Sequence, residues 1–320
     1  MQAMVDDIRS RVGFRSALGL VVLASTVALG CSEGTDLDDP DAVTQPIELF
    51  GDPFQNGTEL PGAMSAGAVR ISVFPASGSG GTGLCSGQVV ARNAVLTAAH
   101  CFTDAGYYKE TNQVRVRIAR RTPEDVTEYL TPSSDHNIVV ATAELNADYL
   151  APGGTLGEGD VALIFTPANL AVVDSNAAAA LVMDPGKRAS ALYLYGYGAI
   201  NDTEYGQRLR RGRFKHLKWD TTYKTFMSDY EGDATHPHAC HGDSGGPYKI
   251  QGTNAPDGIQ FGIHAGAAGT GLCGERDATA AWVAYYDDWI QEKIEDSGRS
   301  CSEQWRWTKE GVGVRTIRCW

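Results

Sequence analysis

The chain has 320 residues, enough to bury one large or two medium hydrophobic cores. Its apolar fraction of 42% and charged fraction of 21% are those of an ordinary soluble globular protein. The formal net charge of −12 argues against a nucleic-acid partner, because phosphates are repelled by an acidic surface.

The first 31 residues have the pattern of an export signal. Three arginines precede an apolar run over residues 17–29, which is too short and wrongly flanked for a stable membrane span. A small residue directly before Cys31 resembles the bacterial lipoprotein signal, in which the cysteine is lipidated. We therefore expect a signal peptide over residues 1–31 with Cys31 lipidated, ordinary secretory cleavage being the alternative. The protein is then exported, as a cell-envelope lipoprotein or in secreted form, and meets the membrane only through Cys31.

The segment that follows, residues 32–53, contains seven acidic residues and no Lys or Arg. It has few apolar residues and no periodicity, so it predicts an acidic linker or a propeptide.

Short runs of alternating apolar and polar residues begin after this segment, and Gly, Pro, Ser or Asn flank each of them. This pattern predicts antiparallel strands joined by hairpins. The predicted strands cover residues 69–74, 88–96, 114–118, 138–143 and 192–198. An alanine-rich stretch over residues 176–181 is expected to be part of a crossover.

Three short motifs carry candidate catalytic residues. Gly-Asp-Ser-Gly-Gly-Pro at residues 242–247 places the Ser244 hydroxyl in a glycine-lined turn. A serine needs a base to take its proton and donors to hold the oxyanion that forms. Candidate partners are His100, in Leu-Thr-Ala-Ala-His-Cys, and Asp160, in Gly-Asp-Val-Ala-Leu-Ile. Asp135 and His136 are adjacent but lie in neither motif, so we interpret them as surface loop residues.

In the order His, Asp, Ser, these motifs resemble those of the trypsin/chymotrypsin-like serine peptidases, over roughly residues 54–295. The resemblance implies an all-β fold of two six-stranded antiparallel Greek-key β-barrels with a C-terminal helix. Barrel one would cover about residues 54–170, barrel two about 180–280 and the helix about 281–295. The apolar residues at helical spacing in that last segment are expected to pack on the core.

The resemblance also assigns roles. His100 would be the general base, Asp160 would orient its imidazole, and Ser244 would attack the scissile carbonyl through an acyl-enzyme intermediate. The amides of Gly242 and Ser244 would form the oxyanion hole. The reaction needs no cofactor and no metal, and the expected partner is a protein or peptide substrate bound by a monomer.

Seven cysteines leave one without a partner, and Cys31 accounts for it. The family likeness implies two bridges beside the histidine and serine loops, and the last two cysteines then close a C-terminal extension over residues 296–320. Three bridges imply an oxidising compartment, and the competing metal site lacks any Cys-x-x-Cys pair. The expected disulfides are Cys85–Cys101, Cys240–Cys273 and Cys301–Cys319.

The activation of the enzyme departs from the family pattern. Family zymogens are usually cut after a basic residue, which frees an amine that pairs with the acid before the serine, here Asp243. Only Gly-Thr-Glu at residues 57–59 matches the sequence with which mature chains of the family begin. No Lys or Arg lies between Arg15 and Arg70. Either another protease cuts near Pro53, or Asp243 is held in some other way.

Five residues are expected to line the substrate pocket. His238 lies six residues before Ser244, where the trypsin-like branch has Asp, so a preference for Lys or Arg is not indicated. Gly-Ile-His at residues 262–264 resembles the bacterial glutamyl endopeptidases, in which a histidine at this place helps to recognise a carboxylate. Imidazoles that share positive charge with a bound acid favour cleavage after Glu or Asp. A neutral pocket is the alternative. The five residues are His238, Ala239, His241, His264 and Gly266.

Other features leave alternatives open. A zinc site at His236-x-His238-x-x-His241 is disfavoured, because Cys240 is expected to be bridged. The basic segment 208–218 predicts a charge-protected strand edge, or else a docking patch or a cleavage site. Three C-terminal tryptophans are expected to pack onto the barrel, with polymer binding as the alternative. They are Trp305, Trp307 and Trp320.

Three functional alternatives remain beside the endopeptidase. They are a catalytically silent binding module of the same fold, a zymogen that awaits non-tryptic activation, and an acyl hydrolase for small esters.

Overall fold

The computed structural model describes a large part of the chain beyond residue 57. The described ranges all belong to the compact unit Gly34–Trp320. The predicted signal peptide and acidic segment lie outside them, and within them no helix is long and apolar enough to cross a membrane. The described ranges are 58–59, 67–75, 82–103, 112–121, 126–150, 157–171, 178–200, 208–228, 237–252, 255–267, 273, 277–308 and 311–320.

The first half of this unit is a closed antiparallel barrel. Its strands follow the order β2-β3-β4-β8-β7-β5-β6, and a further pairing between β2 and β5 closes a ring of six. Successive side chains of a strand point to opposite faces, and this explains the core of the barrel. Val69, Ile71 and Val73 all point inward from one strand and are fully buried. The strands are β2 (Ala68–Phe74), β3 (Gly83–Ala91), β4 (Ala94–Thr97), β5 (Gln113–Arg121), β6 (Thr127–Tyr129), β7 (Val139–Leu145) and β8 (Ala162–Phe165).

The second half is an antiparallel sheet in the order β1-β11-β10-β14-β15-β16-β13-β12. Strand β12 is at one end of this order, and β11 is next to the other end. The two strands are consecutive in the chain and are separated only by His216, which has a φ of 53°. The sheet therefore curves back on itself. Its strands are β1 (Thr58–Glu59), β10 (Ala191–Gly196), β11 (Arg210–Lys215), β12 (Leu217–Asp220), β13 (Thr225–Ser228), β14 (Pro247–Gly252), β15 (Ala255–Ala267) and β16 (Ala278–Trp282).

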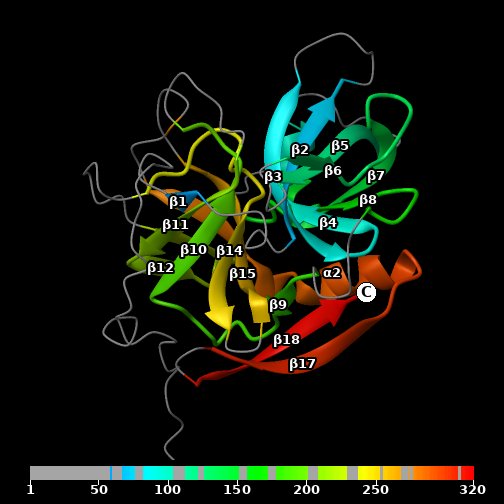
Figure 1. Ribbon diagram of the computed structural model, residues 1–320. Coiled ribbons are helices and arrows are strands. Elements are labelled where there is room, and N and C mark those ends of the chain that lie inside the picture. The colour runs from blue at the N-terminus through cyan, green and yellow to red at the C-terminus, as the bar shows by residue number, and fades with distance from the viewer. Residues whose placement is uncertain are drawn as a thin grey trace, which may run out of the picture. The chain divides into compact units, whose positions relative to one another are not determined.

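The remaining elements are short and flank the barrels. Strand β9 pairs with both β15 and β18, so it joins the C-terminal hairpin to the second sheet. Figure 1 shows this hairpin running beside α2. These elements are α1 (His100–Thr103), η2 (Ala147–Leu150), β9 (Ala180–Val182), η3 (Val283–Tyr285), α2 (Asp287–Asp296), β17 (Cys301–Trp307) and β18 (Gly313–Cys319).

The predicted fold class is confirmed: the unit is almost entirely β-structure, in two barrel-like halves, with one longer helix near its C-terminal end. Three predicted segments differ in the kind of element that they contain. The predicted strand 88–96 is a hairpin, because the chain turns at Arg92 and Asn93 between β3 and β4. The predicted crossover 176–181 ends in strand β9.

The predicted helix 281–295 begins only at Asp287. Trp282 belongs to β16, whose backbone pairs with both β13 and β15, and these ladder hydrogen bonds outweigh the helical spacing of the side chains. Trp282 is nevertheless fully buried, with its ring centroid 4.4 Å from that of Trp219. Ile290 and Ile294 anchor the helix on the core as expected.

Two surface predictions need correction. The predicted exposed edge at 208–218 does not hold at the start of the segment, because β1 pairs there with Arg210 and Arg211 of β11, and both arginines are buried. The segment continues into β12, the last strand of the order, where Lys218 is exposed. The C-terminal tryptophans do not pack on the barrel: Trp305, Trp307 and Trp320 are 66%, 51% and 45% exposed. The hairpin contributes Val314 and Ile317 to the core instead, from its other strand.

Candidate active site

The two residues predicted to act as base and acid lie at neighbouring strand ends of the first barrel. His100 opens the short helix α1, three residues after β4, and Asp160 lies two residues before β8, which pairs with β4. His100 Nδ1 donates a hydrogen bond of 2.7 Å to Asp160 Oδ2, and the His100 backbone N–H donates one of 2.9 Å to Oδ1. Both carboxylate oxygens are thus directed to one histidine, and this fixes the orientation of its ring.

Asp160 is 1% exposed, so its carboxylate is sealed from water. A residue near the C-terminal end of the chain holds the turn that carries Asp160: the Gly159 N–H donates a hydrogen bond of 2.8 Å to the Tyr286 hydroxyl. Burial raises the pKa of Tyr286 above its ordinary value, which keeps that hydroxyl neutral. The sequence offered no signal for this contact, since 127 residues separate the two partners.

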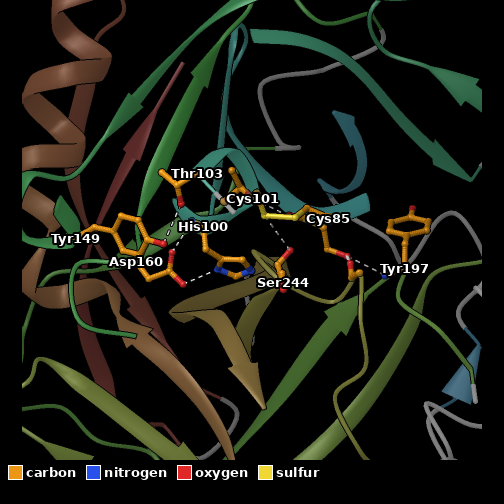
Figure 2. The surroundings of a disulfide bond; sticks show 11 residues. Cys85, His100, Cys101, Thr103, Tyr149, Asp160, Tyr197 and Ser244 are labelled. Atoms are coloured by element: carbon orange, nitrogen blue, oxygen red, sulfur yellow. Dashed lines mark hydrogen bonds and ion pairs between the residues drawn. A yellow bond between two sulfur atoms is a disulfide. The ribbon is translucent and has the colours of Figure 1, made fainter. Parts of the chain in front are cut away.

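Ser244 comes from the second half, three residues before the start of β14, and is partly exposed. Its backbone carbonyl accepts a hydrogen bond of 2.8 Å from the Ser86 N–H of β3, so the serine turn is fixed against the first barrel. Figure 2 shows the His100 imidazole lying between Asp160 and Ser244, beside the Cys85–Cys101 disulfide. The structure therefore brings the three predicted catalytic side chains together.

The serine turn needs glycine at two positions. Gly242 and Gly245 have φ values of 96° and 81°, a region that L-residues rarely adopt. A β-carbon on Gly245 would overlap Thr97 Oγ1 and the Ser86 carbonyl, so the turn lies directly on the first barrel. The Gly242 carbonyl accepts a hydrogen bond of 2.8 Å from Ser86 Oγ. The peptide that carries the Gly242 N–H is fixed by a different bond, because the His241 carbonyl accepts a hydrogen bond of 2.8 Å from the Ala199 N–H.

A cavity of about 450 Å³ opens beside Ser244. This volume is within the usual range for a ligand pocket. Its lining includes His100, His241 and Gly242, together with the disulfide and Arg70. Ser244 itself lines the cavity, so a ligand bound there would lie beside its side chain.

Of the five predicted pocket residues, His241 alone lines this cavity. His238 and Ala239 are buried beneath the serine turn, and His264 is buried in β15. His264 Nδ1 lies 3.4 Å from the Tyr248 hydroxyl, and burial, with a smaller contribution from the charge of His100, lowers its pKa to about 3. His264 is therefore neutral in the free protein.

The three expected disulfides are present, and Asp135 and His136 are exposed loop residues as predicted. The imidazole of His100 and the sulfurs of Cys85 and Cys101 cluster within 4.8 Å. Those sulfurs are bonded to each other and offer no thiolate to a metal. The disfavoured zinc motif includes His236, which lies outside the described residues.

Two antiparallel β-barrels with a histidine, a buried aspartate and a serine at their junction define the fold class of the chymotrypsin-like serine peptidases. Residues 63–290 match the family model described as Trypsin, which covers most of the chain, and the protein belongs to that family of serine proteases.

Two relatives illustrate the likeness. "Lectizyme" of Glossina austeni is 27% identical over 237 residues, which are 66% of this chain and 78% of that protein. A solved structure of HL collagenase superimposes with a TM-score of 0.52 at 19% identity, covering 75% of this chain and 98% of the collagenase chain. At that identity the structural match shows a shared fold.

Proposed function

We propose that the protein is an exported serine endopeptidase in which Ser244, His100 and Asp160 form the catalytic triad. The observation that carries the proposal is the 2.7 Å hydrogen bond between His100 and the buried Asp160, with Ser244 on the other side of the imidazole (Figure 2). Asp160 holds the proton on Nδ1, so that Nε2 is free to take the proton of the serine hydroxyl.

Ser244 then attacks the scissile carbonyl and forms an acyl-enzyme, and His100 returns its proton to the leaving amine. The amides of Gly242 and Ser244 hold the oxyanion. Two hydrogen bonds of 2.8 Å support that assignment, from the Ala199 N–H to the His241 carbonyl and from the Gly246 N–H to the Asp243 carbonyl. These carbonyls belong to the two peptides whose N–H groups would hold the oxyanion.

We further propose that the enzyme cleaves after Glu or Asp. His238 and His264 are both buried near the serine turn and both offer ring nitrogens. His264 is neutral in the free enzyme, so it would recognise a carboxylate first by donating a hydrogen bond. A bound acid would then raise the pKa of the imidazole and favour its protonated form. The small side chain of Ala239 and the absence of one at Gly266 would let a substrate side chain approach these two imidazoles.

Export is the remaining part of the proposal. Three disulfides fit an oxidising compartment. The signal peptide over residues 1–31 and lipidation of Cys31 rest on the sequence pattern alone.

A panel of four matched peptides tests the proposal, with Glu, Phe, Ala or Arg before the scissile bond and Ser244→Ala as the blank. We expect turnover that requires Ser244, with the Glu peptide cleaved about tenfold faster than the others, as one charged hydrogen bond would provide. Equal or faster cleavage of the Phe or Ala peptide would contradict the acidic preference. Hydrolysis of small esters without cleavage of any peptide would contradict the endopeptidase.

A further inference from the structure

Asp243, the residue before the nucleophile, is completely buried, and both of its oxygens accept backbone hydrogen bonds. Oδ1 accepts from the Gly198 N–H at 2.8 Å and Oδ2 from the Cys240 N–H at 2.9 Å. The carboxylate thereby ties the serine turn to the end of β10. A buried carboxylate without a cation is expensive, and burial raises the pKa of Asp243 to about 7.

The pairing of β10 with β11 shows which side chain can supply that cation. Gly196 of β10 lies directly opposite Arg210 of β11. Paired residues of an antiparallel ladder project their side chains to the same face of the sheet. A β-carbon on Gly196 would overlap Asp243 Oδ1, so the carboxylate occupies the space of the missing side chain. Arg210 consequently projects toward the layer in which Asp243 lies.

Gly212, two positions after Arg210, is the next residue on the same face of β11. A β-carbon there would overlap Pro237, at the start of the segment that leads into the serine turn. The serine loop therefore covers this face of β11. Arg210 is only 9% exposed beneath it. Burial raises the pKa of Asp243, and the charge of Arg210 opposes that rise, after the two larger contributions of the backbone hydrogen bonds from Cys240 and Gly198. Arg211 projects to the opposite face, where its guanidinium lies 5.1 Å from the Tyr193 ring centroid.

We propose that Arg210 is the internal cation that holds Asp243 ionised and so shapes the serine turn without a newly cut amino terminus. The proposal rests on the proposed peptidase function, since the turn matters because it carries Ser244. It also accounts for the absence of Lys and Arg between Arg15 and Arg70, because a chain with its own internal cation needs no tryptic activation site. Arg210 is then a positioning residue that acts through Asp243.

A double-mutant cycle tests the pairing independently of activity. We expect Arg210→Met and Asp243→Asn each to lower the melting temperature, because each removes one of two opposite charges that lie buried on the same side of the sheet. The double variant should lose clearly less than the sum of the two single losses. Arg211→Met, on the same strand and equally buried but on the opposite face, should combine additively with Asp243→Asn. Additive losses for Arg210 and Asp243 would overturn the pairing.

Labelling of the full chain with a fluorophosphonate tests the positioning role. We expect Arg210→Met to lower the labelling rate at least tenfold, and Arg210→Lys or added guanidinium ion with Arg210→Met to restore most of it. If Arg210 had only a structural role, Arg210→Met would be labelled more slowly, and neither the lysine variant nor added guanidinium would restore the rate. Arg211→Met should stay within twofold of the native rate.

Intact mass of the labelled protein then separates the two sources of a cation. We expect the adduct on chains that still carry residues before Phe54, and blocking the amine of a chain cut there should change nothing. Labelling confined to chains that begin at Phe54 would overturn the proposal in favour of a terminal amine. If the native protein is not labelled in any form, the peptidase function fails, and the thermal cycle still decides whether Arg210 and Asp243 are paired.

Discussion

Asp160→Asn should reduce kcat by about 10⁴-fold while the protein stays folded. Asparagine keeps the Oδ1 acceptor for the His100 backbone N–H but presents an N–H₂ group to Nδ1 in place of Oδ2. Nδ1 must then accept, so the imidazole proton moves to Nε2, and Nε2 can no longer take the proton of Ser244. The measurement is steady-state hydrolysis of the best peptide of the panel, with the melting temperature recorded on the same preparation.

Asp148→Asn is the matched control for this change. Asp148 pairs with Lys224 at 2.6 Å and its side chain is 45% exposed, so the same substitution there removes a solvent-screened ion pair. We expect kcat within about twofold of the native value, as for other surface pairs. A similar loss of kcat in both variants would mean that overall charge near the site matters, and the tautomer argument for Asp160 would be wrong.

Gly245→Ala should destabilise the protein by on the order of 3 kcal/mol and abolish most activity. Part of the cost is backbone strain, because φ is 81° at this residue. The larger part is the overlap of the new methyl group with Thr97 Oγ1 and with the Ser86 carbonyl, which is backbone and cannot rotate away. For a unit of this size, such a loss corresponds to roughly 6–12 °C in melting temperature.

Gly298→Ala separates the two contributions. Gly298 has nearly the same φ, 80°, but a β-carbon there meets nothing within 4 Å. It should therefore lose only about 1 kcal/mol from strain and leave the activity unchanged. If both variants lose the same stability, the contact of the serine turn with the first barrel contributes little, and the close fit at Gly245 is not what positions Ser244.

The catalytic candidates were the most predictable part of the protein. Each lies in a short motif, and their order along the chain points to one family, so three local patterns indicated an arrangement that only the folded chain assembles. The strand at residues 114–118 was also predicted well, because strict alternation of Val and Arg permits few other structures. The structure extends it to nine residues.

The errors arose where tertiary contacts outweigh local pattern. Trp282 has helical spacing with its neighbours, yet the strands on both sides of it draw its backbone into β16. Arg210 and Arg211 were read as exposed because arginine is usually exposed. Nothing local indicates that Gly196, opposite Arg210 on the neighbouring strand, leaves a space for the carboxylate of Asp243.

The surroundings of the predicted pocket residues were harder still to predict. His241 lines the cavity beside Ser244, whereas His264 is buried and held neutral. The sequence places several histidines near the serine, but it does not show which of them face the cavity. That distinction depends on the burial of β15 in the second barrel.

The proposed peptidase activity requires that Ser244 is an activated nucleophile. The most direct measurement is the intact mass of purified protein after reaction with a fluorophosphonate, beside Ser244→Ala in the same conditions. We predict one adduct on the native protein and none on the variant. A folded native protein that carries no adduct, whether or not it has been cut near Phe54, would contradict the triad and favour a binding module of the same fold.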